Sequence, residues 1–270
     1  MEEVTNSSGE ATVTGGLAFP SGAQSLVYDA DGNLTFDGIW NYQWDAENRL
    51  ISMNMTNISG IANSNRLRLD FGYDYMNRRI SKTVWTNSGL VFVPERTNYF
   101  IYDGWNLIAS FDPTSAVRQS FVWGLDLSGS MANAGGIGGL LVVNNSGGGG
   151  FPSYDGNGNI TGLISGTDKS IVGRYEYNPF GELIRATGPL AKANPFRFST
   201  KFCDGESGLV YYGYRYYNPS QGRWIGRDPA PDQLLELYCF NHNAPTLAVD
   251  PNGKNPILIA MGIGAVWLSY

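Results

Sequence analysis

The sequence contains few of the residues that most metal sites and nucleophilic active sites need. Its 270 residues include one histidine, His242, and two cysteines, Cys203 and Cys239. A lone histidine cannot build a histidine-ligand cluster, and two cysteines this far apart lack the spacing of a zinc site. His242 is also the only base available to a serine or cysteine triad. We therefore predict no metal and no cofactor, a turn position for His242, and two free buried thiols.

Charged residues are also scarce. They make up 16% of the chain, and the formal net charge is −6. An average globular domain carries roughly 25% charged residues. No run of lysine or arginine is present to release counterions from a phosphate backbone. This balance argues against a nucleic-acid partner.

The two ends of the sequence lack a complete targeting or membrane signal. Residues 1–10 are acidic and polar, so we predict no signal peptide in this chain. Residues 257–270 are apolar and uncharged, but this stretch is shorter than the ~20 residues that a spanning helix needs. It is either a short apolar tail or the opening of such a helix in a longer protein, so membrane association stays open. We expect the chain to be a fragment.

The abundant residues favour strands and tight turns. Glycine accounts for 35 of the 270 residues, and aromatic residues for 13%. Tyrosine and tryptophan are typical of strands, and glycine and asparagine are typical of turns. A long helical bundle is built from alanine, glutamate, lysine and leucine instead. The composition therefore predicts an all-β chain.

A short pattern recurs along the chain: an aromatic residue, Asp, two variable residues, Gly or Asn, a variable residue and an apolar residue. Aspartate or asparagine caps a turn with its side chain, and Gly or Asn takes the left-handed backbone position. The aromatic and apolar residues then pair across two strands, so each unit predicts a β-hairpin. Such hairpins stack on their neighbours because none buries its own face alone. The units begin at Tyr28, Trp44, Tyr73, Tyr102 and Tyr154, with Asn-Pro variants at Tyr177 and Tyr217.

A glycine-rich stretch interrupts these units. It resembles a tight strand at 140–143 between flexible loops, and it lacks the strand–glycine–helix context of a phosphate-binding loop. We divide the chain into a polar N-terminal segment (1–24), hairpin repeats (25–127), a Gly-rich linker or loop (128–150), a further hairpin (151–172), a core domain (173–253) and a short apolar tail (254–270).

The segment 173–253 carries the most specific motifs. It reads GRYEYNPFGELIRATG, then NPFRFSTKFCDGESGLVYYGYRYYNPSQGRWIGRDP, then LYCFNHNAPTLAVDPNG. This order closely resembles the core domain that ends Rhs proteins, the bacterial YD-repeat family. The upstream aromatic-Asp units resemble YD repeats, so the resemblance covers about residues 25–253.

The resemblance implies a β-rich strip that spirals into a hollow shell. Relatives of this kind include the C component of insecticidal toxin complexes and the teneurin ectodomain. In bacterial members the shell encloses a C-terminal toxin, and the core domain plugs one end. We predict successive YD-repeat hairpins in a curved, spiralling antiparallel sheet that stays open, with a C-terminal plug. A wall that is polar on both faces would fit the 42% hydrophobic content.

The same resemblance implies partners and a location. The partners would be the remainder of the Rhs shell and a C-terminal toxin in the longer protein, with a secretion-system or cell-surface partner left open. The location would be secreted, or associated with the surface of a bacterial cell.

The resemblance also implies self-cleavage. Many bacterial relatives cut their own chain with the aspartates of two spaced DPxG motifs. Asp228 and Asp250 begin two Asp-Pro motifs at that spacing. By the resemblance they form an aspartyl pair that shares a proton, Arg227 orients one carboxylate, and the cut falls near Lys254.

Two departures from the family pattern leave this reaction open. Pro231 stands where the first motif has glycine, which removes an N–H and a flexible turn. Lys254 stands where relatives usually carry an apolar residue, and its ammonium must stay solvated or paired. The alternative is that both Asp-Pro pairs are simple turns.

Three functions therefore remain. The first is a structural shell or carrier segment of an Rhs-type toxin that lacks an effector domain in this chain. The second is a single-turnover aspartyl autoprotease that releases a C-terminal segment. The third is a cell-surface β-ribbon module that binds glycans or proteins. The tyrosines of 211–217 suggest carbohydrate stacking, although a packed aromatic strand explains them more simply.

Overall fold

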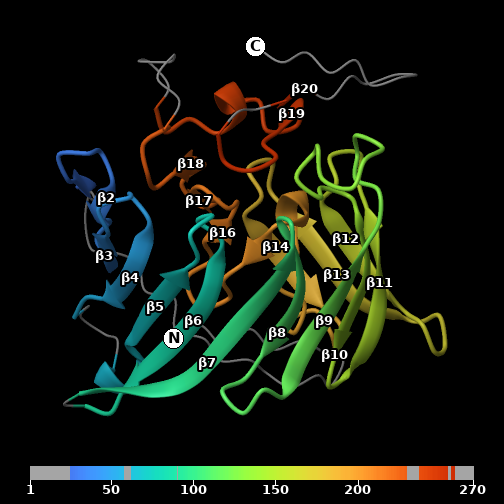
Figure 1. Cartoon of the computed structure of the whole chain (residues 1–270), viewed down its shortest axis with the longest axis horizontal. Coiled ribbons are helices and arrows are strands. Elements are labelled where there is room, and N and C mark those ends of the chain that lie inside the picture. Colours follow the sequence, from blue (N-terminus) through green and yellow to red (C-terminus); the bar gives the residue numbers. More distant parts are fainter. Residues whose placement is uncertain (1–24, 58–61, 90, 230–236, 255–256, 259–270) are drawn as a thin grey trace, which may run out of the picture.

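The computed structural model describes residues 25–57, 62–89, 91–229, 237–254 and 257–258. These residues form one fourteen-stranded antiparallel sheet, a four-stranded sheet and a two-stranded sheet. The large sheet runs in chain order from β1 (Val27–Tyr28) to β14 (Leu183–Thr187), so each strand pairs with its sequence neighbours. Among the described residues, β1 and β14 are the two edge strands of this sheet, which Figure 1 shows from β2 onward. The all-β prediction is confirmed, and so is the open, curved antiparallel sheet.

The remaining strands are two to twelve residues long. Strands β2 to β13 are Leu34–Phe36, Trp40–Trp44, Leu50–Met55, Leu67–Tyr73, Arg79–Asn87, Phe92–Asp103, Asn106–Phe111, Val117–Trp123, Leu140–Asn145, Gly148–Tyr154, Ile160–Ser165 and Ile171–Tyr177. Strands β15 to β20 are Phe202–Cys203, Val210–Tyr211, Tyr216–Asn218, Arg223–Trp224, Ala248–Val249 and Ile257–Leu258. Three 3-10 turns, η1 to η3, cover Asn63–Asn65, Phe198–Thr200 and Asn241–Asn243.

The repeat units form equivalent hairpins. In five of the seven units the opening aromatic residue pairs with the residue six positions later, as Tyr28 does with Leu34 and Tyr154 with Ile160. Tyr102 instead pairs with Leu107, and Tyr217 with Trp224. In the unit that opens at Trp44, the Asp45 Oδ1 atom accepts the N–H groups of Glu47 at 2.9 Å and Arg49 at 3.0 Å. This Asx geometry closes the turn without help from the rest of the fold. The hairpin reading of the repeat is therefore confirmed.

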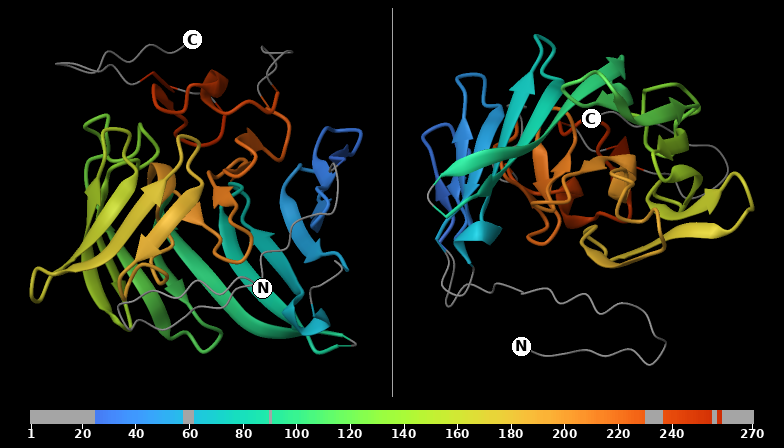
Figure 2. Two further views of the ribbon diagram at one scale, coloured as in Figure 1. Left: turned by 180° about the vertical axis from the view of Figure 1, so that it is seen from behind. Right: turned by 90° about the horizontal axis from the view of Figure 1, so that it is seen from below.

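The large sheet curves around the chain that follows it. We call the described residues 189–229 and 237–254 the plug, and Figure 2 shows the sheet wrapping around this segment. Side chains of β2 to β6 pack on Leu209, Tyr211, Tyr216 and Ile225 of the plug. Side chains of β7 to β13 pack on Leu190 and Phe196. The inner face of this wall is therefore apolar, which corrects the expectation of a wall polar on both faces.

A buried ion-pair cluster fixes the plug against the sheet. The Arg79 guanidinium lies 2.6 Å from Asp204, and the Lys82 ammonium lies 2.7 Å from the other oxygen of the same carboxylate. All three residues are buried. Burial alone would raise the pKa of Asp204, but Arg79 and Lys82 outweigh it and hold that pKa below its usual value. Two cations from β6 therefore satisfy one buried carboxylate of the plug.

The glycine-rich segment 128–150 does not interrupt the sheet. The expected strand at 140–143 is part of β10, but Gly148–Gly150, which we expected in a loop, lie in β11. These two strands pair with each other and continue the sheet in order. The predicted division between 172 and 173 falls inside β13. The large sheet thus continues into the segment that we assigned to the core domain.

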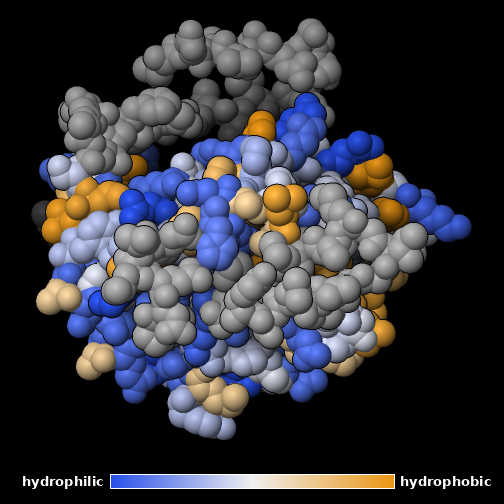
Figure 3. Space-filling view, turned by 90° about the horizontal axis from the view of Figure 1, so that it is seen from above, coloured by the Kyte–Doolittle hydropathy of each residue, from blue (hydrophilic) through white to orange (hydrophobic). Residues whose placement is uncertain are grey.

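The predicted terminal segments fall almost entirely outside the described residues, because 1–24, 255–256 and 259–270 are not among them. Where the structure describes the chain, it contains no helix of the length and hydropathy that crossing a membrane requires. Seen from above, the residues coloured by hydropathy in Figure 3 are mostly hydrophilic, with scattered hydrophobic ones.

Candidate functional site

The two aspartates of the Asp-Pro motifs meet at one buried arginine. The Arg215 Nη1 atom lies 2.9 Å from Asp228 Oδ2, and its Nη2 atom lies 3.6 Å from Asp250 Oδ2. Arg215 comes from the tight connection between β16 and β17, and its guanidinium stacks 4.1 Å from the ring centroid of Trp224. The side chains of Arg215 and Asp250 are 4% and 2% exposed, whereas that of Asp228 is 19% exposed. The fold thus brings together two carboxylates that lie far apart in sequence.

Asp250 also holds the turn that follows it. Its Oδ1 atom accepts the backbone N–H groups of Asn252 at 3.1 Å, Gly253 at 2.7 Å and Lys254 at 3.2 Å. This is the turn geometry of the YD hairpins, now inside the protein. Gly253 takes a φ of +84°, which a residue with a side chain rarely adopts. We call this segment, 250–254, the plug turn.

The peptide bond between Gly253 and Lys254 is held at both of its polar atoms. The Arg215 Nε–H donates a hydrogen bond to the Gly253 carbonyl oxygen, and the Lys254 N–H donates to Asp250. During hydrolysis of a peptide, negative charge develops on the carbonyl oxygen, and a cation bound there stabilises it. The leaving amine needs a proton, and a carboxyl group beside the nitrogen can supply it. This bond lies in the region where the sequence predicts a cut, near Lys254.

Burial changes the pKa values of Asp250 and Arg215 in opposite directions. Burial raises the pKa of Asp250 above its usual value, while Arg215 and the backbone N–H groups of the plug turn oppose this rise. Burial likewise lowers the pKa of Arg215, and the two aspartates oppose that change. Arg215 stays a cation because its ordinary pKa lies so far above neutrality. Burial therefore favours the protonated form of Asp250.

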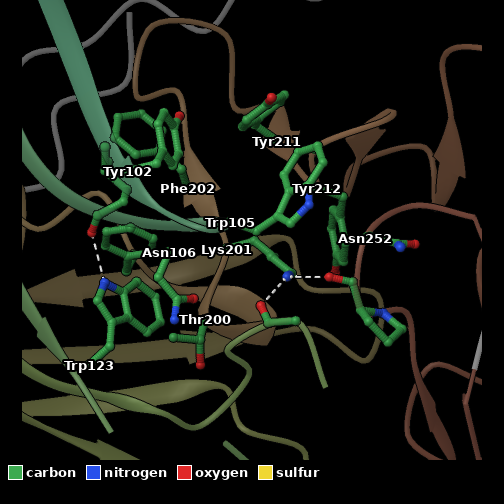
Figure 4. Close-up of a pocket in the computed structure, with 15 residues that line it drawn as sticks. Tyr102, Trp105, Asn106, Trp123, Thr200, Lys201, Phe202, Tyr211, Tyr212 and Asn252 are labelled. Atoms are coloured by element: carbon green, nitrogen blue, oxygen red, sulfur yellow. Dashed lines mark hydrogen bonds between the residues drawn. The ribbon is translucent and has the colours of Figure 1, made fainter. Parts of the chain in front are cut away.

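A buried lysine fixes the plug turn from its other side. The Lys201 ammonium donates hydrogen bonds to the carbonyl oxygens of Pro251 at 2.6 Å and Gly135 at 2.7 Å (Figure 4). Tyr212 lies beside it, with its ring centroid 5.5 Å from Nζ. Burial lowers the pKa of Lys201 to about 8, although Asp250 and Asp126 work against this change. Lys201 therefore ties the plug turn to the loop before β10.

That loop approaches the plug turn so closely that a glycine is needed. Gly135 has a φ of +64°, and a Cβ atom built on it would lie 1.9 Å from the Pro251 carbonyl oxygen. Any side chain there would push the plug turn away from Lys201. The glycine-rich character of the segment before β10 thus has a packing reason at this position.

The predicted role of Arg227 is not supported by its position. Arg227 is exposed and its side chain lies near Gly32 of the first hairpin turn. Among the described residues, the ion pairs of Asp228 and Asp250 are made by Arg215 instead. Pro231 lies outside the described residues. Sequence reasoning missed Arg215, although one signal existed: a single arginine within a run of tyrosines, which is costly to bury without acidic partners.

A cavity of about 460 Å³ opens beside Asp228. Its wall combines hairpin turns of the sheet, such as Asn33 and Glu47, with Asp228 and Lys254. The site therefore has room for water next to the partly exposed carboxylate. Among the described residues, no group of three or more histidine, cysteine or acidic side chains is arranged to hold a metal ion.

The chain resembles several toxin-related proteins. No protein-family model matches it. The tRNA nuclease WapA of Bacillus subtilis (strain 168) is 31% identical over 238 residues, which make up 85% of this chain and 9% of that protein. Toxin subunit YenC2 of Yersinia entomophaga is 37% identical over 109 residues, which make up 39% of this chain and 11% of that protein.

A solved structure shares the fold. The Tc holotoxin pore of Photorhabdus luminescens, with its TccC3 component, superposes with a TM-score of 0.64 at 21% identity, over 90% of this chain and 11% of that chain. The fold is therefore that of an Rhs-type shell wall. Together with the sequence relatives, it establishes that the chain belongs to the Rhs/YD-repeat family. The chain spans about a tenth of the length of these relatives.

Proposed function

We propose that the chain forms the last stretch of wall, and the plug, of an Rhs-type toxin shell. The observation that carries this proposal is the continuous sheet packed against the plug, in which β1 is an edge strand among the described residues. An open edge presents unpaired N–H and C=O groups, which preceding repeats would satisfy. The proposed partners are the rest of the shell and an enclosed toxin, and the proposed location is outside the cytoplasm or at the cell surface. The division at 173 and the binding of glycans remain predictions.

Electron cryomicroscopy of the protein purified from its native source tests this function. We expect the sheet to continue beyond β1 into further strands that enclose a closed volume. A native protein in which the β1 edge faces solvent, with no preceding strand, would contradict the proposal. Limited proteolysis adds a second readout, since any enclosed segment should be cut far more slowly after folding than after denaturation.

A second function rests on the geometry around the Gly253–Lys254 bond. We propose that this bond is hydrolysed once by the chain itself. Asp228, which borders the cavity, removes a proton from water as that water attacks the Gly253 carbonyl carbon. Arg215 Nε–H stabilises the negative oxygen that forms. As the C–N bond breaks, Asp250 gives its proton to the Lys254 nitrogen, which leaves as an amine, and Gly253 keeps the new carboxyl group.

Intact mass spectrometry of the purified chain tests self-cleavage. We expect two fragments divided after Gly253, and a single intact mass for Asp228→Asn and for Asp250→Asn. Asp45→Asn is the matched control, because Asp45 caps the same type of turn at the surface. It should be cut like the parent chain. An uncut parent, or fragments that persist in both site variants, would exclude this reaction.

A further inference from the structure

The side chain of Lys254 is seated on an aromatic ring. Its Nζ atom lies 3.4 Å from the ring centroid of Tyr214. An ammonium this close to the face of a tyrosine ring is attracted by the electron density above the ring. Tyr214 immediately precedes Arg215, which contacts the Gly253 carbonyl oxygen. Two neighbouring residues of the plug therefore contact the two sides of the Gly253–Lys254 bond: Arg215 on the Gly253 side and Tyr214 on the Lys254 side.

The Tyr214 ring is fixed before any side chain rests on it. Its centroid lies 5.0 Å from that of Trp105, in the turn between β7 and β8. The Tyr214 backbone N–H donates to the carbonyl oxygen of Asn252 in the plug turn at 3.1 Å. The large sheet and the plug turn thus hold the ring from two directions. A pre-positioned ring loses little conformational freedom when it binds a partner.

Formal charge alone does not explain the position of Lys254. The cavity that it borders is lined by acidic Asp31, Glu47 and Asp228, and by basic Arg49, Arg215 and Arg227. These charges nearly balance. Within the described part of the chain, the Lys254 ammonium forms no ion pair and lies over the Tyr214 ring.

We propose that Tyr214 is the specificity-determining residue for position 254 and selects a cationic side chain there. This rests on the proposed self-cleavage, because residue 254 is the first residue after the cut. With its ammonium on the ring, Lys254 also keeps its backbone N–H 3.2 Å from Asp250 Oδ1. An acidic side chain at 254 would be repelled by the face of the ring.

A double-mutant cycle tests the contact without relying on cleavage. It is measured by urea unfolding in an Asp228→Asn background, which keeps the chain whole. Lys254→Met keeps most of the length of the side chain without its charge, and Tyr214→Leu removes the ring. We expect the two changes to be coupled by about two- to thirtyfold in the unfolding equilibrium constant. Equal costs of Lys254→Met with and without Tyr214→Leu would overturn the proposal.

The rate of cleavage tests selection itself. Chains are made by cell-free translation with Asp228 intact, and the fraction cut is followed in time. We expect Tyr214→Leu to slow cutting by about two- to thirtyfold. Tyr214→Phe, which keeps a ring face, should slow cutting less than Tyr214→Leu, and Lys254→Glu should be slower than Lys254→Met. Lys254→Glu cut at the parent rate, or Tyr214→Phe as slow as Tyr214→Leu, would overturn the proposal. If the parent is never cut, the proposed self-cleavage fails, and the unfolding cycle alone decides whether Tyr214 selects the cation.

Discussion

The turn that begins at Asp45 and the turn that begins at Asp250 use the same hydrogen bonds in opposite surroundings. In both, the Oδ1 atom accepts the N–H groups two and four residues later. Asp45 lies at the rim of the sheet and pairs with Arg49 at 2.8 Å, while Asp250 is buried beside Arg215. Burial would raise the pKa of Asp45, but hydrogen bonds from Arg49 outweigh it and lower that pKa. For Asp250, burial prevails and its pKa rises.

The same Asp turn, with the same hydrogen bonds, therefore has different roles at the rim of the sheet and in the plug. At the rim, the Asp side chain closes a hairpin and holds its charge in water. In the plug, the same atoms hold a peptide bond against a buried cation, and the carboxyl is ready to carry a proton. The pattern of residues specifies the turn, and the packing around it specifies the chemistry.

Replacing each aspartate with alanine should give the largest difference in stability between the two turns. Asp250→Ala leaves buried N–H groups without an acceptor and takes one of the two carboxylates from the buried Arg215. We expect it to lower the free energy of unfolding by about 3 kcal/mol. Asp45→Ala exposes comparable groups to water and should cost about 1 kcal/mol. Urea unfolding measures both. Equal costs would mean that burial adds nothing to the plug turn.

The sequence predicts the turns better than it predicts the site. Each Asp-x-x-Gly/Asn unit carries its own hydrogen-bonding side chain and left-handed residue, so the hairpins follow from local chemistry. The spacing of the two Asp-Pro motifs, read through the family resemblance, selected Asp228 and Asp250. Only one local signal indicated Arg215, its position within a run of tyrosines, because its role depends on packing between segments that are remote in sequence. Arg227 was selected because it adjoins Asp228 in the chain, whereas Arg215 is the residue that forms an ion pair with Asp228.

A pair of glycines refines the comparison. Gly135 and Gly104 both have positive φ, at +64° and +56°. A Cβ on Gly135 would meet the Pro251 carbonyl oxygen at 1.9 Å, whereas one on Gly104, in a rim turn, would meet nothing within 4 Å. Both alanine variants carry the left-handed backbone penalty of about 1 kcal/mol. We expect Gly135→Ala to cost about 1–3 kcal/mol more, because the plug turn must shift.

Thermal or urea unfolding of the two glycine variants measures this difference. Cleavage after Gly253 should also slow in Gly135→Ala and stay unchanged in Gly104→Ala, because only the former displaces the plug turn. Matching losses of stability in the two variants would show that the close approach of Gly135 to Pro251 contributes nothing.

The smallest expected effect is a difference in the sign of a pH dependence. The pKa of Asp45 in the folded protein lies below the unfolded value of about 3.9. The unfolded state then binds more protons, so the Asp45 contribution is present above that pH and is lost as pH falls. The pKa of Asp250 lies above its unfolded value. The folded state then binds more protons, so the Asp250 contribution is lost as pH rises through the folded pKa.

Asparagine variants reveal the sign of each pH dependence, because asparagine can still accept the hydrogen bonds of the turn but does not titrate. Unfolding free energies are measured between pH 3 and pH 7 for the parent and both variants, with Asp228→Asn in every chain to prevent cleavage. We expect the gap between parent and Asp45→Asn to widen as pH rises, and the gap between parent and Asp250→Asn to narrow. Two gaps that widen together would mean that Asp250 is an ordinary ionised cap, and would remove the proton donor from the proposed cleavage.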